Sequence, residues 1–326
     1  MLRSSRKTSL NAALLALATV VALPASSQIL GLTSPSADTS IQVSGQISRS
    51  GVGVATYNSK LWVVYSSHSS NGNLFITYQT GSNSYATPVQ VPGAVVNNNP
   101  QIAVYNNKLL ISWVDNTGLL MVATTTDGLN FTNLGNCQGV IANSSSFGAF
   151  DSPSMAVLKN FLYIGFRTSN GSLGICTVFQ QTTNLYTLDA SFTSGFNLGD
   201  APGLGTFNGV MYIAYKDNSG SNFIHLLETI DGVNFSVNDN ALSNHTSTQP
   251  SLVEYLGVLY IGYRQNSSDD EFYYTYSTDG TTFQPFVSET WGMGGPPALV
   301  VGPDGKFYNI FSGNSSSHFL STSSTQ

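Results

Sequence analysis

The sequence predicts an all-β protein, a six-bladed β-propeller whose blades are four-stranded antiparallel sheets and whose ring is closed by an N-terminal strand. Three observations lead to this fold class. One repeat of about fifty residues occurs six times, and its apolar residues alternate in short runs typical of strands. No segment after residue 27 shows a sustained helical period.

Two columns of residues recur when the six copies are aligned. A proline precedes the first apolar run of five copies, and an aromatic residue closes the second run of all six. The proline column comprises Pro100, Pro153, Pro202, Pro250 and Pro297, with Val52 in the first copy. The aromatic column comprises Tyr65, Trp113, Phe166, Tyr215, Tyr263 and Phe311. Recurrence at fixed spacing indicates that the same structural unit forms each time.

Each copy also carries the pattern of a hairpin. In the second copy, the runs 102–105 and 109–113 flank Asn106-Asn107, a turn that joins antiparallel strands. A third run follows, such as 223–229 in the fourth copy, and a short outer strand completes four. Such a sheet cannot bury both faces alone, so we expect the copies to stack around an axis.

Closure of the ring is predicted from the two ends of the chain. The last copy stops after its third strand near Leu320, and the segment 41–47 alternates like a strand, so we expect this segment to supply the missing outer strand. Closure removes the exposed sheet edge. A linear solenoid is the alternative, but it requires polar capping repeats.

Residues 1–27 have the pattern of a secretory signal peptide, because Arg3, Arg6 and Lys7 precede a mostly apolar run that ends in small residues. The run from Ala12 to Leu23 is shorter than the roughly 20 residues that span a bilayer, so no membrane insertion is expected. We predict a flexible segment at 28–40, a propeller at 41–326, and a secreted protein that is extracellular or periplasmic.

Charge and composition narrow the classes of partner. Removal of the signal peptide takes away three of eleven basic residues and leaves eight against seventeen acidic ones. Nucleic acid is not an expected partner, because phosphate binding needs a basic stripe. Charged residues are only 9% of the chain, and the neutral polar surface suits hydroxyl-rich ligands, so glycans or glycoconjugates are the expected partners. The sequence predicts no oligomeric state.

Three copies share an Asp-Gly turn at one position. The turns occupy 124–131, 228–235 and 276–283. They resemble the Asp-box turn of sialidases and related propellers, which reads Ser-x-Asp-x-Gly-x-x-Trp, although here Asp and Gly are adjacent and Phe replaces Trp. From the residues alone we expect a structural role, in which Asp caps the turn, Gly takes a positive φ and Phe packs between sheets.

The six copies also resemble the six-bladed fucose-binding lectins of fungi and bacteria, over residues 41–322. The resemblance lies in the repeat length, the proline before the inner strand and the aromatic residue that closes the second strand. It implies binding sites between adjacent blades, built from an arginine, an acidic or amide partner and a stacking aromatic ring. The chain has only three Trp, whereas those lectins are rich in it.

The candidate binding residues follow from strand direction. The loop before the inner strand and the loop after the second strand of each blade lie on one face, where Asp115 and Asn116 are also expected. The candidate ligand-binding residues on this face are Arg167, Lys216 and Arg264 as donors, Asp151, Asp200 and Gln249 as their partners, and Trp113 or Trp291 as stacking platforms. Such groups recognise sugar hydroxyls by bidentate bonds and stacking. The alternative is that these cations only pair with neighbours at strand ends.

The favoured function is therefore that of a secreted, non-catalytic, carbohydrate-binding protein with several weak sites between blades. A sialidase-like glycosidase is the alternative, but it needs three converging arginines, and Arg167 and Arg264 lie in blades two apart. Asp151 and Asp200 enter adjacent inner strands, yet no spacing singles out an acid and a base. An extracellular protein-interaction scaffold is the second alternative, and no catalytic residue is predicted.

Cysteine and histidine usage gives two further expectations. Cys137 and Cys176 are the only cysteines, and they form either one disulfide or two buried thiols. The four histidines lack the spacing of a metal site, so the sequence predicts neither a metal nor a cofactor.

Overall fold

A computed structural model describes residues 30–37, 51–67, 72–81, 84–96, 98–137, 151–182, 185–193, 195–238, 242, 244–266, 268, 270–313 and 320–325. The chain divides into two compact units, Met1–Leu30 and Gly31–Gln326, and every strand described here belongs to the second. Over the described residues the second unit consists of strands and turns, and no helix there is long and apolar enough to cross a membrane.

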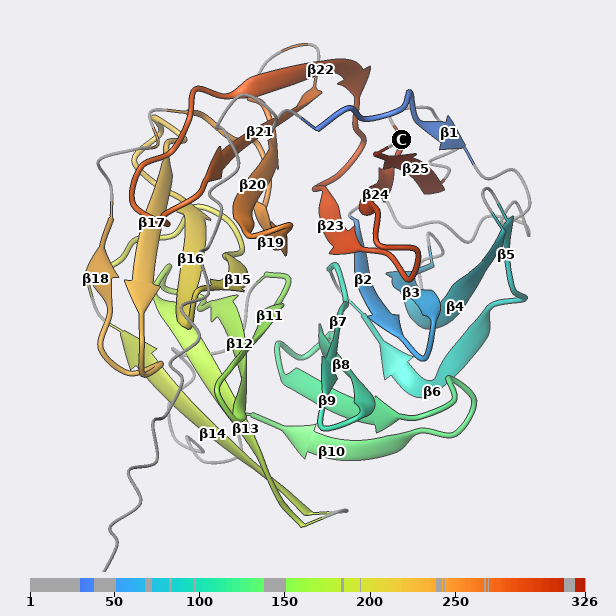
Figure 1. Ribbon diagram of the computed structural model, residues 1–326. Helices are drawn as coiled ribbons and strands as arrows, with labels where there is room; N and C mark the ends of the chain where they lie inside the picture. Colours follow the sequence, from blue (N-terminus) through green and yellow to red (C-terminus); the bar gives the residue numbers. More distant parts are fainter. Residues whose placement is uncertain are drawn as a thin grey trace, which may run out of the picture. The chain divides into compact units, whose positions relative to one another are not determined.

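The strands of the second unit form six antiparallel sheets arranged as the blades of a propeller (Figure 1). Blade 1 contains β2 (Val52–Tyr57), β3 (Lys60–Ser66), β4 (Asn73–Gly81), β5 (Ser84–Tyr85) and β6 (Val89–Val95), and both β5 and β6 pair with β4. Blade 2 contains β7 (Gln101–Tyr105), β8 (Lys108–Val114), β9 (Leu120–Thr125) and β10 (Thr132–Asn136). Blade 3 contains β11 (Ser154–Leu158), β12 (Phe161–Arg167), β13 (Leu173–Thr182) and β14 (Leu185–Thr193). Blade 4 contains β15 (Gly203–Phe207), β16 (Val210–Lys216), β17 (Ile224–Thr229) and β18 (Ser236–Val237). Blade 5 contains β19 (Ser251–Tyr255), β20 (Val258–Arg264), β21 (Glu271–Ser277) and β22 (Val287–Gly292). Blade 6 contains β23 (Ala298–Val301), β24 (Phe307–Ser312), β25 (Leu320–Ser324) and β1 (Ser36–Ala37).

The inner strands meet in a closed cycle. Each of β2, β7, β11, β15, β19 and β23 contacts the inner strand of the next blade, and β2 contacts both β7 and β23. Each proline of the proline column stands directly before an inner strand, where its missing N–H takes nothing from the sheet. The predicted six-bladed propeller is therefore confirmed, and the solenoid alternative is wrong.

Blade 6 is completed by residues near the N-terminus, but not by the predicted segment. The neighbour of β25 is β1, in which Ser36 and Ala37 pair with Thr322 and Ser321. The pairing extends to Thr33, whose N–H donates to the carbonyl of Ser324 at 2.9 Å. The strand that closes the ring thus lies upstream of the predicted 41–47, a segment outside the described residues.

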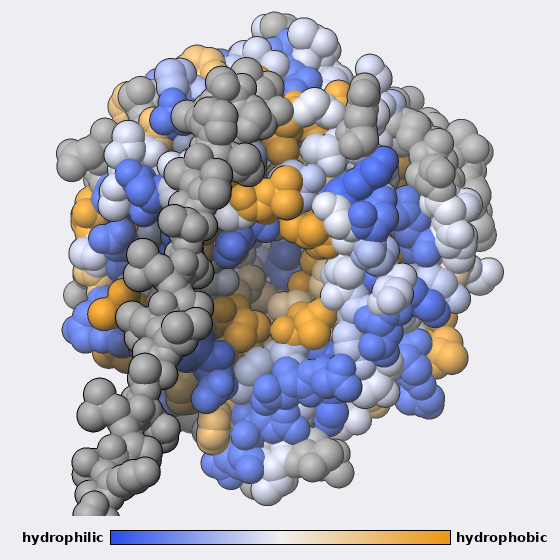
Figure 2. Space-filling model, viewed as in Figure 1, coloured by the Kyte–Doolittle hydropathy of each residue, from blue (hydrophilic) through white to orange (hydrophobic). Residues whose placement is uncertain are grey.

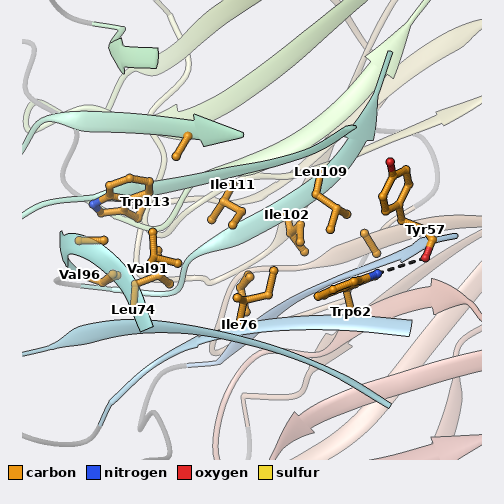
Figure 3. Packing of buried hydrophobic residues seen from close by; sticks show 14 residues of the cluster. Tyr57, Trp62, Leu74, Ile76, Val91, Val96, Ile102, Leu109, Ile111 and Trp113 are labelled. Carbon is orange, nitrogen blue, oxygen red and sulfur yellow. Dashed lines mark hydrogen bonds between the residues drawn. The ribbon is translucent and has the colours of Figure 1, made fainter. Parts of the chain in front are cut away.

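Aromatic and aliphatic side chains fill the spaces between blades. All six residues of the aromatic column are buried, with at most 7% of each exposed. Between blades 1 and 2, Trp62 and Ile76 belong to the same buried cluster as Leu109, Ile111 and Trp113, as Figure 3 shows. The aromatic column therefore recurs because each copy must supply one large side chain to the packing between sheets.

The Asp-Gly turns are held by the same hydrogen bonds in all three blades that carry them. In blade 2, the Asp127 carboxylate accepts the backbone N–H groups of Leu129 and Asn130, both at 2.8 Å. These bonds hold the pKa of Asp127 well below its ordinary value. Gly128 has a φ of +70°, and a Cβ there would overlap Trp62 of blade 1. Each such turn thus locks one blade against the preceding blade, which is the structural role expected.

Cys137 and Cys176 form a disulfide, with their Cα atoms 6.0 Å apart. Cys176 lies on β13 of blade 3, and the Cys137 N–H donates to Leu120 of β9 in blade 2. Both cysteines are fully buried, so the bond is a covalent link between two blades inside the packing.

Candidate functional site

The residues predicted to form sites do lie at one end of the blades. Ser154 pairs with Gly165 and Ser251 with Gly262, so the start of each inner strand faces the end of the second strand. We call this end of the ring the proline face, because the proline column lies there, and the opposite end the hairpin face. The two are distinct because the tight turns between inner and second strands all lie on the hairpin face.

Blades 3 and 4 bring four of the predicted residues together. Arg167 Nη1 lies 2.9 Å from Asp151 Oδ2, and Arg167 Nε donates to the carbonyl of Leu198 at 2.7 Å. That carbonyl belongs to the loop that leads to Asp200 and into blade 4. The backbone of Lys216 holds the same loop, because its carbonyl accepts the Gly199 N–H at 2.8 Å. The side chain of Arg167 is thus held in place by two contacts within the protein.

Asp200 is the titratable group most affected by this cluster. Burial raises its pKa to about 6, and the negative charge of Asp151 raises it as well. The Ala201 N–H, which Oδ1 accepts at 2.7 Å, and the positive charges of Lys216 and Arg167 act in the opposite direction. Asp200 forms no ion pair with a described residue, so burial dominates and the carboxyl takes up a proton near pH 6.

Arg264 and Trp291 both lie in blade 5, and both side chains contact other residues of the protein. Arg264 forms an ion pair with Asp270, which precedes β21. Trp291 stacks on Phe272 of its own blade, with ring centroids 5.2 Å apart, and on Phe311 of blade 6 at 4.9 Å. Trp291 thereby joins two blades. Within the described part of the chain, the Arg264 Nε group is buried without a hydrogen-bond partner.

Gln249 lies near the axis and links three blades. Its side-chain amide donates to the carbonyls of Pro153 at 3.1 Å and Pro202 at 2.8 Å, and only 5% of the residue is exposed. It borders a cavity of about 80 Å³ lined by inner-strand residues, and Figure 2 shows the ring hollowed at its centre. The amide group of Gln249 is therefore engaged in holding the inner strands together.

An open pocket of about 210 Å³ lies between blades 1 and 2. Its apolar wall comes from Val91 and Val95 of β6, Met121 of β9 and Phe131. Trp113 contributes only an edge, since 4% of it is exposed, and Figure 3 shows its indole nitrogen at the end turned away from the buried cluster.

Polar groups of blade 2 surround the same pocket. They are Asp115, Asn116 and Asn133. The Asp115 carboxylate is fixed by its own loop, because Oδ1 accepts the N–H groups of Thr117 at 2.8 Å and Leu119 at 2.9 Å. Asn116 is exposed beside it. An apolar wall facing convergent amide and carboxylate groups is the usual composition of a small-molecule site.

Of the predicted site residues, the structure therefore places Trp113 at a pocket and gathers Asp151, Arg167, Asp200 and Lys216 into one cluster. From the sequence, Phe131 was expected only to pack between sheets at the end of an Asp-Gly turn, and Asn133, which belongs to no recurring column, was not assigned to a site. Asp115 and Asn116 were expected on this face but were not singled out. Among the described residues, no group of three His, Cys, Asp or Glu is placed to hold a metal ion.

Comparisons with known proteins identify the fold. No family model matches the sequence, and a search of curated proteins finds no similar one. Among solved structures, the fucose-specific lectin from Aleuria aurantia superimposes with a TM-score of 0.61 and 11% identity, over 86% of this chain and 93% of the lectin.

Two enzymes also share the architecture. Trypanosoma rangeli sialidase gives a TM-score of 0.54 at 10% identity over 89% of this chain, which spans only 57% of the sialidase. An α-L-arabinofuranosidase from Clostridium thermocellum gives 0.51 at 16% identity, over 73% of this chain and 93% of the enzyme. At these identities the comparisons show a shared fold, so the predicted resemblance to lectin and sialidase propellers is confirmed at the level of architecture.

Proposed function

We propose that this chain is a secreted, non-catalytic, carbohydrate-binding propeller that holds a sugar in the pocket between blades 1 and 2. The observation that carries the proposal is the pocket itself, with an apolar wall on one side and Asp115, Asn116 and Asn133 on the other. A sugar ring offers a C–H face for an apolar wall and hydroxyl groups for amides and carboxylates. Export rests on the signal-peptide pattern of residues 1–27.

The size of the pocket supports one sugar unit rather than a long chain. Sites for drug-sized ligands usually measure about 300–1,000 Å³, whereas this pocket measures about 210 Å³. The similar lectin from Aleuria aurantia is fucose-specific, and a structure of a variant of it holds α-methyl-L-fucoside, so a propeller of this architecture can bind a single sugar unit. Binding of a single sugar unit is expected to be weak. Because the proposal gives each protein molecule one such pocket, avidity for a surface with many sugar units would require several protein molecules to bind it together.

A glycan array tests the proposal, with Asn116→Ala as the pocket variant. Asn116 is exposed and follows the loop that Asp115 fixes, so its truncation removes hydrogen-bonding groups without disturbing the core. We expect a loss of about 3- to 10-fold in affinity, as one or two neutral hydrogen bonds contribute.

Asn218→Ala is the matched control for that variant. Asp217-Asn218 follows the second strand of blade 4 as Asp115-Asn116 follows that of blade 2. The control should leave the affinity unchanged. A loss with Asn218→Ala and none with Asn116→Ala would move the site to another blade, and an array without any bound glycan would overturn the function.

A glycoside hydrolase is the second candidate, and the Asp151–Asp200 cluster favours it. A carboxyl whose pKa is raised, next to a second carboxyl, is the arrangement that acid catalysis of glycosidic cleavage requires. Against it, Asp151 is paired with Arg167, and the described arginines Arg167 and Arg264 each face their own carboxylate. Turnover of fluorogenic glycosides, including a sialoside, that disappears with Asp200→Asn would establish this function in place of the first.

A further inference from the structure

The pocket between blades 1 and 2 lacks a basic side chain that blades 3, 4 and 5 carry on the proline face. The position after the aromatic column carries Arg167 in blade 3, Lys216 in blade 4 and Arg264 in blade 5. In blade 2 the same position is Val114, which is 1% exposed. Blade 2, which forms one side of the open pocket, thus lacks the basic side chain that blades 3, 4 and 5 have at this position.

A carboxylate takes the place of that cation at the rim. Asp115 is the one ionisable residue among those that line the pocket in the described part of the chain. Its Oδ1 atom accepts three bonds from its own loop, from the Thr117 N–H, the Thr117 hydroxyl at 2.7 Å and the Leu119 N–H. The carboxylate is therefore fixed in position at the pocket, and Oδ2 accepts no hydrogen bond from the described residues.

The described lysines of the two blades lie too far away to offset this charge. Lys60 and Lys108 begin β3 and β8, at the hairpin face, while Asp115 follows the opposite end of β8. Six residue steps separate Lys108 from Val114, which corresponds to roughly 20 Å along a strand. Charges that far apart are largely screened at physiological ionic strength. Moreover, Lys60 Nζ lies over the ring of Tyr78, 3.7 Å from its centroid.

From these observations we infer that the pocket selects neutral sugars and rejects anionic ones, such as uronic acids and sialic acids. The inference rests on the proposed function and specifies its ligand class. A neutral ring donates a hydroxyl proton to the Asp115 carboxylate and lays its C–H face on the wall around Phe131. A sugar carboxylate in the same place meets a fixed like charge and finds no basic partner among the described residues that line the pocket, which makes its binding unfavourable.

Matched sugar pairs test this selectivity directly. Methyl glycosides of glucose, galactose and mannose are compared by calorimetry with the corresponding uronic acids, which differ only in the carboxylate at C6. For whichever neutral sugar binds, we expect the uronic acid to bind at least about tenfold more weakly at low salt, because a like-charge contact there costs about 1.4 kcal/mol or more. Because the charges are partly exposed to solvent, the ratio should shrink as salt is added.

Asp115→Asn provides the decisive variant. An asparagine oxygen still accepts the loop bonds of Oδ1 but carries no charge, so the neutral-to-anionic ratio should fall to about one. The control is Asp217→Asn, the same change at the equivalent position of blade 4, which should leave the ratio as in the wild type. Thermal unfolding of each variant shows that it is folded.

The outcomes separate the two claims. Equal binding of both members of a pair by the wild type, or a ratio unaffected by Asp115→Asn, overturns the selectivity while the carbohydrate-binding function stands. Binding of no sugar in either form overturns the proposed function, and the selectivity falls with it.

Discussion

Replacement of Asp200 by asparagine is expected to stabilise the protein at neutral pH. Burial raises the pKa of Asp200 to about 6 in the folded chain, against about 3.9 in an unfolded one. The folded state therefore binds the proton more tightly, and stability rises as the pH falls from about 6 to about 4. Above pH 6 the folded chain holds a charged Asp200 at a cost of about 2 to 3 kcal/mol, since each pKa unit corresponds to about 1.4 kcal/mol.

Asparagine removes this cost and keeps an oxygen for the Ala201 N–H. Denaturant unfolding followed by tryptophan fluorescence should show the variant about 2 kcal/mol more stable than the wild type at pH 7 and equal to it near pH 4. Asp189→Asn is the control, because Asp189 is exposed on β14 and should give no such pH-dependent difference. A variant that is less stable than the wild type at pH 7 would refute the reasoning.

Asp151→Asn extends the same argument to its neighbour. The Asp151 charge raises the pKa of Asp200, and Asp151 also engages Arg167. Its neutralisation should lower the pKa of Asp200, so that the pH-dependent change in stability moves to lower pH. Carboxyl titration followed by ¹³C NMR measures this shift, and an unchanged Asp200 pKa would show that the two carboxyls do not interact.

Two further predictions concern contacts between blades. Gly128→Ala should lower the free energy of unfolding by about 2 to 5 kcal/mol, because the residue has a positive φ and its Cβ would overlap Trp62. Gly209 also has a positive φ but lies in open space, so Gly209→Ala should lower it by only about 1 to 2 kcal/mol. Equal losses in denaturant unfolding would show that the overlap is unimportant. The double variant Cys137→Ala and Cys176→Ala should lose about 4 kcal/mol, from a disulfide that closes a separation of 39 residues, and unchanged unfolding midpoints would contradict this.

The blades were predictable because their determinants repeat. A proline must stand where the inner strand begins, and a large aromatic side chain must fill the space between sheets, so both columns recur in the sequence. The strand that closes the ring was placed too far downstream. Its two residues, Ser36 and Ala37, are too few to show an alternating pattern, and their pairing with β25 depends on where the C-terminus lies.

The site was predictable only in part, because contacts between different copies do not repeat. Strand direction in the sequence placed Asp151 and Arg167 on the same face of the ring, and in the structure they form an ion pair there. In the sequence, Gln249 precedes a proline and has the pattern of an exposed loop residue. In the ring this position lies near the axis, where the side-chain amide is buried and donates to the carbonyls of Pro153 and Pro202. The partner of Arg264 is Asp270, from a loop whose conformation no residue pattern specified.

The central claim is that the junction of blades 1 and 2 holds a sugar. A crystal structure of the protein with the tightest-binding neutral glycan tests it most directly. The account predicts a sugar ring lying against Phe131 and Val95, with hydroxyl groups bonded to Asp115 and Asn116. Glycan density beside Arg264 or over the axis near Gln249, with the pocket of blades 1 and 2 empty, would contradict it.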